Sequence, residues 1–215
     1  MPTLGAVAHL ILLIVEAQIH KLALQDRQWM RGRTVNDTTP SAQYSAKNVA
    51  NYFLKTYGRK HGISPVKLQK LVYLAHGWHL ALYGEPLVAD ENAEAWQYGP
   101  VFPSLYHEFS EFGRGPITRL ADDYEIADPQ TGKVKLVVTP DIPKRDTQVR
   151  RLLDKIWEVY GTYAPWQLSA MTHKPDSPWD KTRKQSGNKN NADIDAEIIA
   201  AHYKNLIPTR AATHD

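Results

Sequence analysis

A chain of 215 residues with ordinary shares of charged (23%) and of apolar and aromatic residues (42%) is long enough for one domain with a sizeable core. Because it has no cysteine, disulfides, thiolate metal sites and cysteine nucleophiles are excluded, and a cytoplasmic location fits. The net charge of +3 is too small to indicate nucleic-acid binding by itself, whereas six tryptophans and eleven tyrosines can fill a core and anchor an interface.

The first 44 residues are predicted to form an N-terminal extension ahead of the folded domain. Residues 4–15 are uncharged, but a membrane-spanning helix needs about 20 apolar residues. No basic segment precedes them, as it would in a signal peptide. Two interpretations stay open: an amphipathic helix that precedes the domain, or translation that starts at Met30. Peptides found upstream of Met30 in the native protein would rule out the second.

The first predicted helix of the domain begins after Ser45, a good N-cap residue, and ends near Gly58. The second extends from Ser64, with a proline in its first turn, to Gly84. Apolar residues cover most of the circumference of this second helix, which predicts that neighbouring elements enclose it. Its core-facing positions recur at helical spacing and are Leu68, Leu71, Val72, Ala75, Trp78, His79 and Leu82.

Short strands and further helices are predicted after this central helix. Residues 93–98 alternate enough for a strand, and a Gly-Pro corner then leads into a helix that starts at Pro103. A second strand covers residues 134–139, after a turn of sequence Pro-Gln-Thr-Gly. Capping residues and apolar spacing predict three more helices, which begin after Asp146, at Pro165 and near Asp193.

These elements predict a mainly α (α+β) protein, a compact single-domain helical bundle around one central buried helix with two or three short strands. The domain is expected to cover residues 45–207, and residues 208–215 are expected to form a disordered tail. Residues 174–191 are predicted to be a basic loop before the last helix, with Trp179 in its middle.

Histidines are the residues closest to metal or hydrolase chemistry, since His76 and His79 lie one turn apart and His61, His107 and His173 add further donors. A zinc hydrolase helix has the pattern His-Glu-x-x-His, whereas this helix has His-Gly-Trp-His without a carboxylate between the histidines. The sequence also has no Gly-rich phosphate loop. We therefore expect no catalytic residue, no metal site and no cofactor, with the helix histidines bonded to backbone or tyrosine in the core.

The basic segment around Trp179 is the part of the surface that the sequence marks for contact. Arg183 and several lysines surround the indole, a pattern that could bind nucleic acid through charge and stacking. Asp176 and Asp180 dilute that charge, and the alternative is that the indole packs back against the helices. The sequence favours this second interpretation.

Three blocks of the sequence resemble one known family. They are LQKLVYLAH at 68–76, YGEPL at 83–87 with EAWQYGPVFPSLY at 94–106, and LSAMTH at 168–173 with SPW at 177–179. In this order they are similar to the SocA-type antitoxins, also called the Panacea domain and, in older descriptions, phage-associated proteins. The resemblance extends over residues 45–207.

The resemblance implies a mostly helical antitoxin of a bacterial or prophage toxin–antitoxin system, without catalytic residues. It implies one partner, a cognate protein toxin encoded by a neighbouring gene, which is neutralised by direct binding or by delivery to a protease. We select Tyr106, Trp179 and Arg183 as candidate toxin-binding residues, since aromatic and arginine side chains dominate interface energetics. A DNA-binding or regulatory protein and a histidine-dependent hydrolase stay open as alternative functions.

Overall fold

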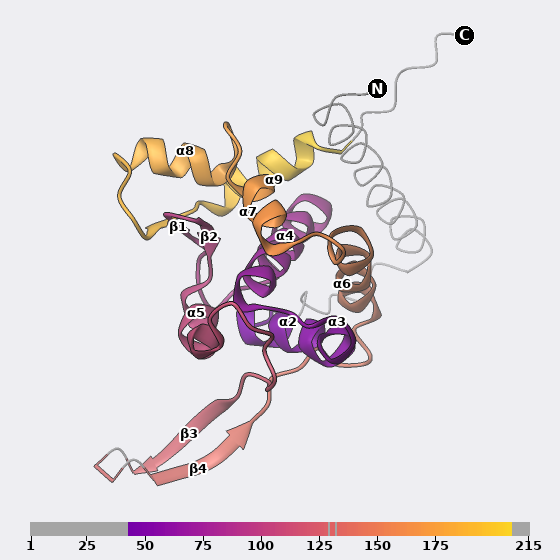
Figure 1. Cartoon of the computed structure of the whole chain (residues 1–215), viewed down its shortest axis with the longest axis vertical. Helices are drawn as coiled ribbons and strands as arrows, with labels where there is room; N and C mark the ends of the chain where they lie inside the picture. The colour runs from indigo at the N-terminus through magenta and orange to yellow at the C-terminus, as the bar shows by residue number, and fades with distance from the viewer. Residues whose placement is uncertain (1–42, 129, 132, 208–215) are drawn as a thin grey trace, which may run out of the picture.

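The computed structural model describes residues 43–128, 130–131 and 133–207, and its helices surround one central helix, α4 (Figure 1). The helical elements are α2 (Ala46–Phe53), the π-helical segment η1 (Leu54–Gly58), α3 (Arg59–His61), α4 (Pro65–Tyr83), α5 (Pro103–Phe109), the 3-10 segment η2 (Ser110–Phe112), α6 (Thr147–Tyr160), α7 (Pro165–Thr172), α8 (Pro178–Gln185) and α9 (Ala196–Asn205). The strands are β1 (Glu94–Trp96), β2 (Gly99–Val101), β3 (Asp123–Asp128), β4 (Lys133–Val138) and β5 (Ala192–Asp193). The mainly α (α+β) class is confirmed.

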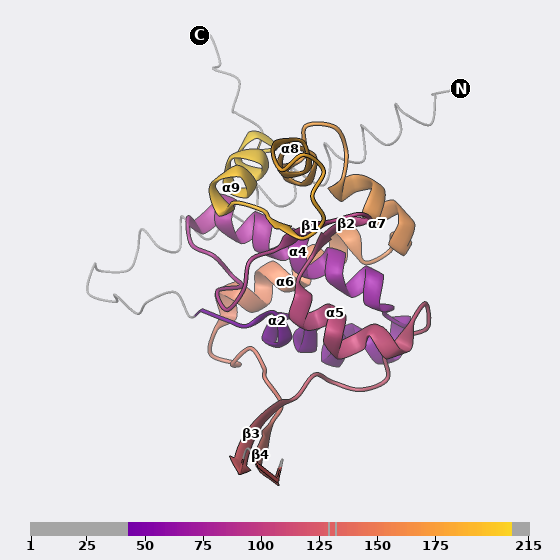
Figure 2. The same ribbon diagram turned by 90° about the vertical axis from the view of Figure 1, so that its left-hand side faces the viewer.

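Helix α4 is enclosed by its neighbours, as predicted, because every residue from Leu68 to Ala81 is buried. It packs against α2, α5, α6, α7 and α9 (Figure 2). Its start with Pro65 in the first turn and its end at Gly84, which is left-handed with φ +80°, are also confirmed. The indole of Trp78 is fully buried, and its N–H donates to the Tyr160 hydroxyl at 3.1 Å.

Gly77 lies where α9 rests on α4, and this close approach leads to a prediction. A Cβ added at Gly77 would lie 2.3 Å from a ring carbon of Tyr203, which is 4% exposed. We expect Gly77→Ala to lower the free energy of unfolding by about 2 kcal/mol, because overpacking outweighs the better helix propensity of alanine. Thermal unfolding measures this loss.

The matched control is Gly58→Ala, since Gly58 is also helical but a Cβ there would meet only Leu54, at 3.7 Å. This variant should be as stable as the parent protein or slightly more stable. Equal stability of the two alanine variants would contradict the packing of α9 on α4.

The first helix continues past its predicted end at Gly58. That residue has φ −59° and is helical, and the chain passes through η1 and α3 to Gly62, whose φ of +62° ends the helical path. A glycine ends a helix when it adopts the left-handed conformation. The sequence contained two glycines four residues apart and did not show which of them would do so.

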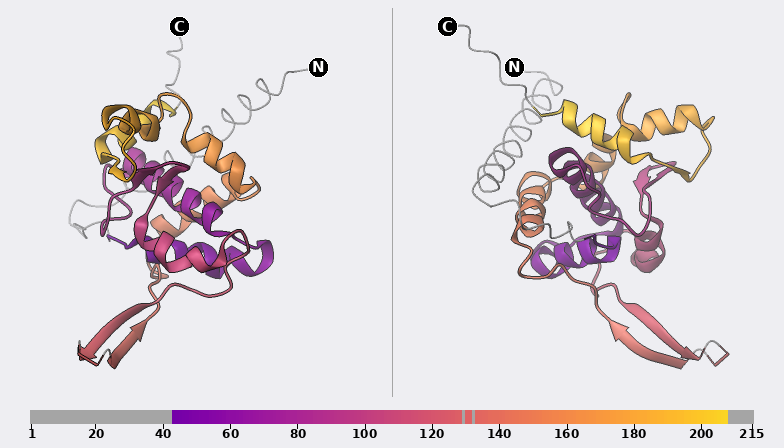
Figure 3. Two further views of the ribbon diagram at one scale, coloured as in Figure 1. Left: turned by 60° about the vertical axis from the view of Figure 1, so that its left-hand side comes forward. Right: turned by 180° about the vertical axis from the view of Figure 1, so that it is seen from behind.

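Strands β3 and β4 form an antiparallel hairpin that projects from the helical body (Figure 3). The sequence predicted β4 but not β3, because the pair Asp122-Asp123 at its start resembles a solvated loop. Tyr124 faces Val137 across the hairpin, and these side chains are 59% and 51% exposed. We call this element, residues 123–138, the hairpin arm.

A single buried side chain of α2 binds the two chain segments that flank the hairpin arm. Asn51 is fully buried, and its amide donates to the carbonyls of Ala121 at 2.9 Å and Pro140 at 2.8 Å. Its side-chain oxygen accepts the backbone N–H of Ala121 at 2.8 Å. Lys47 and Lys55 add ion pairs on either side, to Asp123 at 3.0 Å and Asp141 at 2.9 Å. The base of the arm is therefore fixed, whereas its strands extend beyond the helices.

The region predicted as a basic loop contains helix α8, so that prediction is wrong. Ser177 caps the helix by accepting the backbone N–H of Asp180 at 3.2 Å, and Pro178 occupies its first turn. Ser-Pro followed by an acidic residue is a helix-start signal, but the polar and basic composition concealed it. The following residues Ala192–Asp193 form β5, which pairs with β1 in a small sheet of order β2-β1-β5.

The last two residues of the predicted extension belong to the described part of the chain. Tyr44, at the end of the predicted extension, is 6% exposed, and its hydroxyl donates to Asp146 at 2.6 Å. The rest of the predicted extension up to Ala42, together with the predicted tail at 208–215, lies outside the described residues. None of the helices in the described part of the chain is long and apolar enough to cross a membrane.

Candidate functional site

The three predicted contact residues come together around strand β1. The ring of Tyr106, on α5, lies 4.8 Å from the ring of Trp96. The indole N–H of Trp179, on α8, donates to the Trp96 carbonyl at 2.7 Å. A guanidinium nitrogen of Arg183 lies 3.5 Å from the Ala95 carbonyl. Helices α5 and α8 therefore bring all three side chains to one short strand.

These three side chains differ in what they offer to a partner. Tyr106 is 45% exposed, so part of its ring is available. Trp179 and Arg183 are half-buried, and the guanidinium lies 5.9 Å from the indole ring and also bonds to Lys189 and Asn190. Both therefore attach α8 and the segment after it to β1, which agrees with the interpretation that the indole packs back on the domain.

The basic residues near Trp179 are partly neutralised within the domain. Lys184 pairs with Asp180 at 2.7 Å, which is a one-turn contact along α8. Arg183 is bonded to backbone carbonyls. These contacts leave fewer free charges for phosphate groups than the sequence alone suggested.

Tyr98 is a candidate contact residue that the sequence reasoning missed. It lies in the two-residue turn between β1 and β2, where Trp96 pairs with Gly99, and it is 76% exposed. An aromatic side chain at a hairpin turn has no strand face to place it in the core, and this signal could have identified it. We call the set Trp96, Tyr98, Tyr106, Trp179 and Arg183 the β1 surface.

A buried lysine of α4 lies directly beneath the β1 surface. Lys70 is 2% exposed, and its ammonium donates to the Pro100 carbonyl at 2.9 Å. Gly99 has φ +107°, and a Cβ there would lie 2.5 Å from the lysine nitrogen, so this position requires glycine. Burial lowers the pKa of Lys70 from 10.5 to about 7.

His173 completes this buried polar layer. Its ring lies 5.0 Å from that of Trp179, and its Nδ1 is buried without a hydrogen-bond partner among the described residues. Burial lowers the pKa of His173, and the nearby Lys70 lowers it further. The lowered pKa values of His173 and Lys70 both disfavour positive charge in the buried layer beneath β2.

Gln69, the neighbour of Lys70, fixes the segment that follows β2. Its amide donates to the Phe102 carbonyl at 2.9 Å, and its oxygen accepts the Phe102 N–H at 2.9 Å. The side chain of Gln69 thus satisfies both backbone polar groups of the buried residue Phe102, as a neighbouring strand would. The polar pair Gln69-Lys70 in the central helix therefore positions the β1–β2 hairpin, while Leu68 and Leu71 beside it fill the core.

The helix histidines are bonded to the backbone that follows α4, as predicted. His76 accepts the N–H of Val88 on Nδ1 at 3.2 Å, and Nδ1 of His79 donates to the Glu85 carbonyl at 2.7 Å. Burial lowers the pKa of both, that of His76 to about 4, so both imidazoles are neutral at physiological pH. Within the described residues, no three His, Asp or Glu side chains gather as ligands for a metal ion.

Comparison with known proteins places these features in one family. The model of the family "Antitoxin SocA-like, Panacea domain" matches residues 68–180, from α4 into the start of α8. The chain belongs to the SocA-like Panacea family. Antitoxin SocA of Caulobacter vibrioides (strain NA1000 / CB15N) is 35% identical over 136 residues, which are 63% of this chain and 68% of the relative. No solved structure shows a significant match.

The Panacea match contains most of the β1 surface and the polar residues beneath it. Tyr106 and Trp179 lie inside the matched residues, whereas Arg183 lies just beyond them. Gln69 and Lys70 also lie inside, at the start of the match.

Proposed function

We propose that this chain is an antitoxin that neutralises a cognate protein toxin by binding it directly. The observation that carries the proposal is the 35% identity to Antitoxin SocA, which covers 68% of that protein. The contacts of His76 and His79 support binding rather than hydrolysis, because both rings are used to hold the backbone after α4. We further propose a toxin encoded by a neighbouring gene.

The β1 surface supports a binding role through its exposed aromatic side chains. Tyr98 and Tyr106 present large, partly apolar surfaces, the type of side chain that dominates binding energy in protein interfaces. Lys70 bonds to the Pro100 carbonyl beneath this surface, and within it Trp179 bonds to the Trp96 carbonyl, so its parts are held in place. Such preorganisation reduces the entropy lost on binding. In this proposal Tyr106 contacts the toxin, and Trp179 and Arg183 shape the surface around it.

The first experiment tests the antitoxin role itself. The neighbouring open reading frame is expressed alone and together with this protein. We expect growth arrest in the first case and restored growth in the second. A neighbour without effect on growth, or an arrest that co-expression leaves unchanged, would contradict the proposal. The lifetime of the toxin is then measured in the rescued cells. Delivery to a protease would shorten it, whereas direct inhibition would leave it unchanged.

The second experiment locates the toxin on the β1 surface. The double variant Tyr98→Ala, Tyr106→Ala should bind the toxin about 30-fold more weakly, which corresponds to about 2 kcal/mol for the loss of aromatic contacts. Isothermal titration with purified proteins measures the change, and thermal unfolding checks that the variant is folded.

The matched control removes exposed apolar surface elsewhere. The variant Tyr124→Ala, Val137→Ala alters the hairpin arm, whose side chains are exposed to a similar extent. It should bind the toxin with unchanged affinity. Loss of affinity in this variant, with full affinity retained in the β1 variant, would move the toxin-binding site to the hairpin arm.

A further inference from the structure

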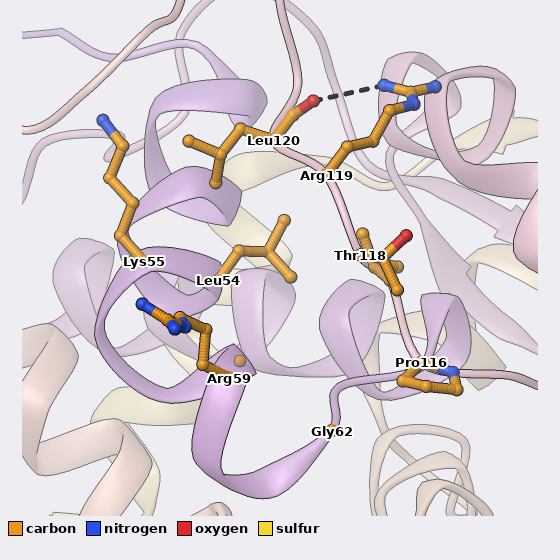
Figure 4. A pocket seen from close by; sticks show the side chains of 10 residues that line it. Leu54, Lys55, Arg59, Gly62, Pro116, Thr118, Arg119 and Leu120 are labelled. Carbon is orange, nitrogen blue, oxygen red and sulfur yellow. Dashed lines mark hydrogen bonds between the residues drawn. The ribbon is translucent and has the colours of Figure 1, made fainter.

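A groove lies away from the β1 surface, where η1 and α3 meet the segment after η2. It has a volume of about 560 Å³ and is lined by η1, the start of α3 and residues 116–120 (Figure 4). The backbone N–H of Ile117 donates to the Ile63 carbonyl at 2.8 Å and joins the two walls. Figure 1 shows α3 and α8 at different ends of the helical body. A ligand in the groove would therefore leave the β1 surface free.

The floor of the groove is apolar. Leu54 and Ile117 are 5% and 6% exposed, so they are packed into the core and present only a small surface to the groove. Leu120 and Pro116 extend this apolar lining. An apolar side chain of a ligand would find a matching surface here.

The rim of the groove is cationic. Lys55, Arg59 and Arg119 line it, and Figure 4 shows the charged ends of Lys55 and Arg59 on the same side. Two of the three cations are already paired: Lys55 with Asp141 at 2.9 Å, and Arg119 with Glu108 and Glu111. Within the described residues, Arg59 has no ion pair, and it is exposed. The uncompensated charge at the rim is therefore that of Arg59, with exposed Lys60 next to it.

The wall that carries Lys55 and Arg59 has an unusual backbone. Residues Leu54–Gly58 form a π-helical turn between two α-helical segments. Such turns are rare and occur frequently at functional sites. Here the widened turn contributes Leu54 to the floor and Lys55 to the rim. Arg59 follows directly after this turn, at the start of α3.

We propose that this groove binds a short acidic segment of a partner protein. An apolar side chain of the segment rests on Leu54 and Ile117, and a neighbouring carboxylate pairs with Arg59. Charge complementarity selects this occupant, because the floor accepts an apolar group and Arg59 has no ion pair among the described residues. This inference goes beyond the toxin-binding role and does not depend on it.

A labelled synthetic peptide tests the proposal without knowledge of the partner. The probe is the peptide Asp-Glu-Leu-Asp-Glu-Leu-Asp-Glu, and fluorescence anisotropy with the full chain measures its binding at physiological salt. We expect saturable binding in the micromolar range, with a loss of about tenfold when alanine replaces both leucines or when lysine replaces the acidic residues. Absence of saturable binding below about 1 mM would overturn the proposal.

Two variants of exposed lining residues and one control locate the peptide. Arg59→Glu reverses the rim charge, and Thr118→Glu adds a carboxylate on the opposite wall. Each should weaken peptide binding by about tenfold. The control Lys60→Glu makes the same charge change at an exposed neighbour that does not line the groove, and it should retain affinity within about twofold. Equal losses of affinity in Arg59→Glu and Lys60→Glu would show that the peptide is attracted nonspecifically by positive charge. Displacement of the peptide by millimolar phosphate would show that the groove is a simple anion site. Either result would overturn the proposal.

Toxin rescue by the same variants keeps the two proposals separate. Arg59→Glu and Thr118→Glu should still neutralise the toxin, because they leave the β1 surface intact. Failure of the parent protein to rescue growth would concern the antitoxin role alone, whereas failure of peptide binding would concern the groove alone.

Discussion

Asn51→Ala should lower the free energy of unfolding by roughly 3–5 kcal/mol, which is a large part of the stability of a typical domain. The substitution removes three buried hydrogen bonds to Ala121 and Pro140 and leaves their backbone groups without partners. Because these residues flank the two ends of the hairpin arm, the arm should also lose its fixed direction. Urea unfolding measures the stability, and hydrogen exchange measures the protection of β3 and β4.

The matched control for this prediction is Asn205→Ala, at an exposed position near the end of α9. It should change the free energy of unfolding by less than about 0.5 kcal/mol. Asn51→Asp provides a second test, since a carboxylate can accept the Ala121 N–H but cannot donate to the two carbonyls. If Asn51→Ala is as stable as Asn205→Ala, the anchoring role of Asn51 is wrong.

Lys70→Met should abolish a pH dependence of stability between about pH 7 and pH 10.5, the folded and ordinary pKa values of this lysine. In that range the unfolded chain binds a proton that the folded chain has released, so the free energy of unfolding rises with pH. The total rise is roughly 3–5 kcal/mol, at about 1.4 kcal/mol for each unit of the pKa difference. Below pH 7 both states are protonated, and the burial of the charge destabilises the fold by a constant amount.

Urea unfolding at several values of pH compares this variant with the parent protein. The free energy of unfolding of the parent protein minus that of Lys70→Met should increase with pH between about 7 and 10.5 and be constant below pH 7. Groups that titrate in both proteins cancel in this difference. Lys60→Met, a control at an exposed position, should follow the parent protein at every pH. Parallel curves for the parent protein and Lys70→Met would contradict the burial of Lys70 under Pro100.

The central helix shows how much the sequence predicted. A proline in its first turn and Gly84 after its last one mark its limits, and its apolar circumference indicates that it is enclosed. These signals act within a few residues, so they hold in any tertiary context. The bonding of His76 and His79 to backbone was also predicted, because the pair lies inside an apolar helix and lacks the spacing and the carboxylate of a zinc hydrolase helix.

Helix α8 and strand β3 show where local reasoning failed. Helix α8 was not predicted because its segment is basic and polar, and strand β3 was not predicted because two consecutive aspartates stand at its start. In the structure, Asp123 is paired with Lys47 of α2 at 3.0 Å, and Trp179 of α8 is bonded to β1. Contacts between residues far apart in the sequence therefore stabilise elements that their own composition does not indicate.

The β1 surface depends both on residue types that the sequence shows and on contacts that only the tertiary structure shows. Side-chain type alone selected Tyr106, Trp179 and Arg183, since aromatic and arginine residues are common in interfaces. Their convergence on β1 was not predictable, because Trp179 and Arg183 reach it across 83 and 88 residues of chain. The burial of Lys70 beneath Gly99 and Pro100 also depends on contacts between distant parts of the chain, whereas the exposure of Tyr98 follows from its place in a hairpin turn.

The sequence by itself determined the family, the mainly helical class, the central helix and its caps, because these follow from local residue patterns and from the order of three motif blocks. Only the tertiary structure decided that Asn51 anchors a projecting arm, that Lys70 lies under a glycine, and that an apolar groove has an exposed arginine at its rim. The physical reason is that burial and charge pairing depend on contacts between distant segments of the chain, and local sequence patterns do not specify those contacts.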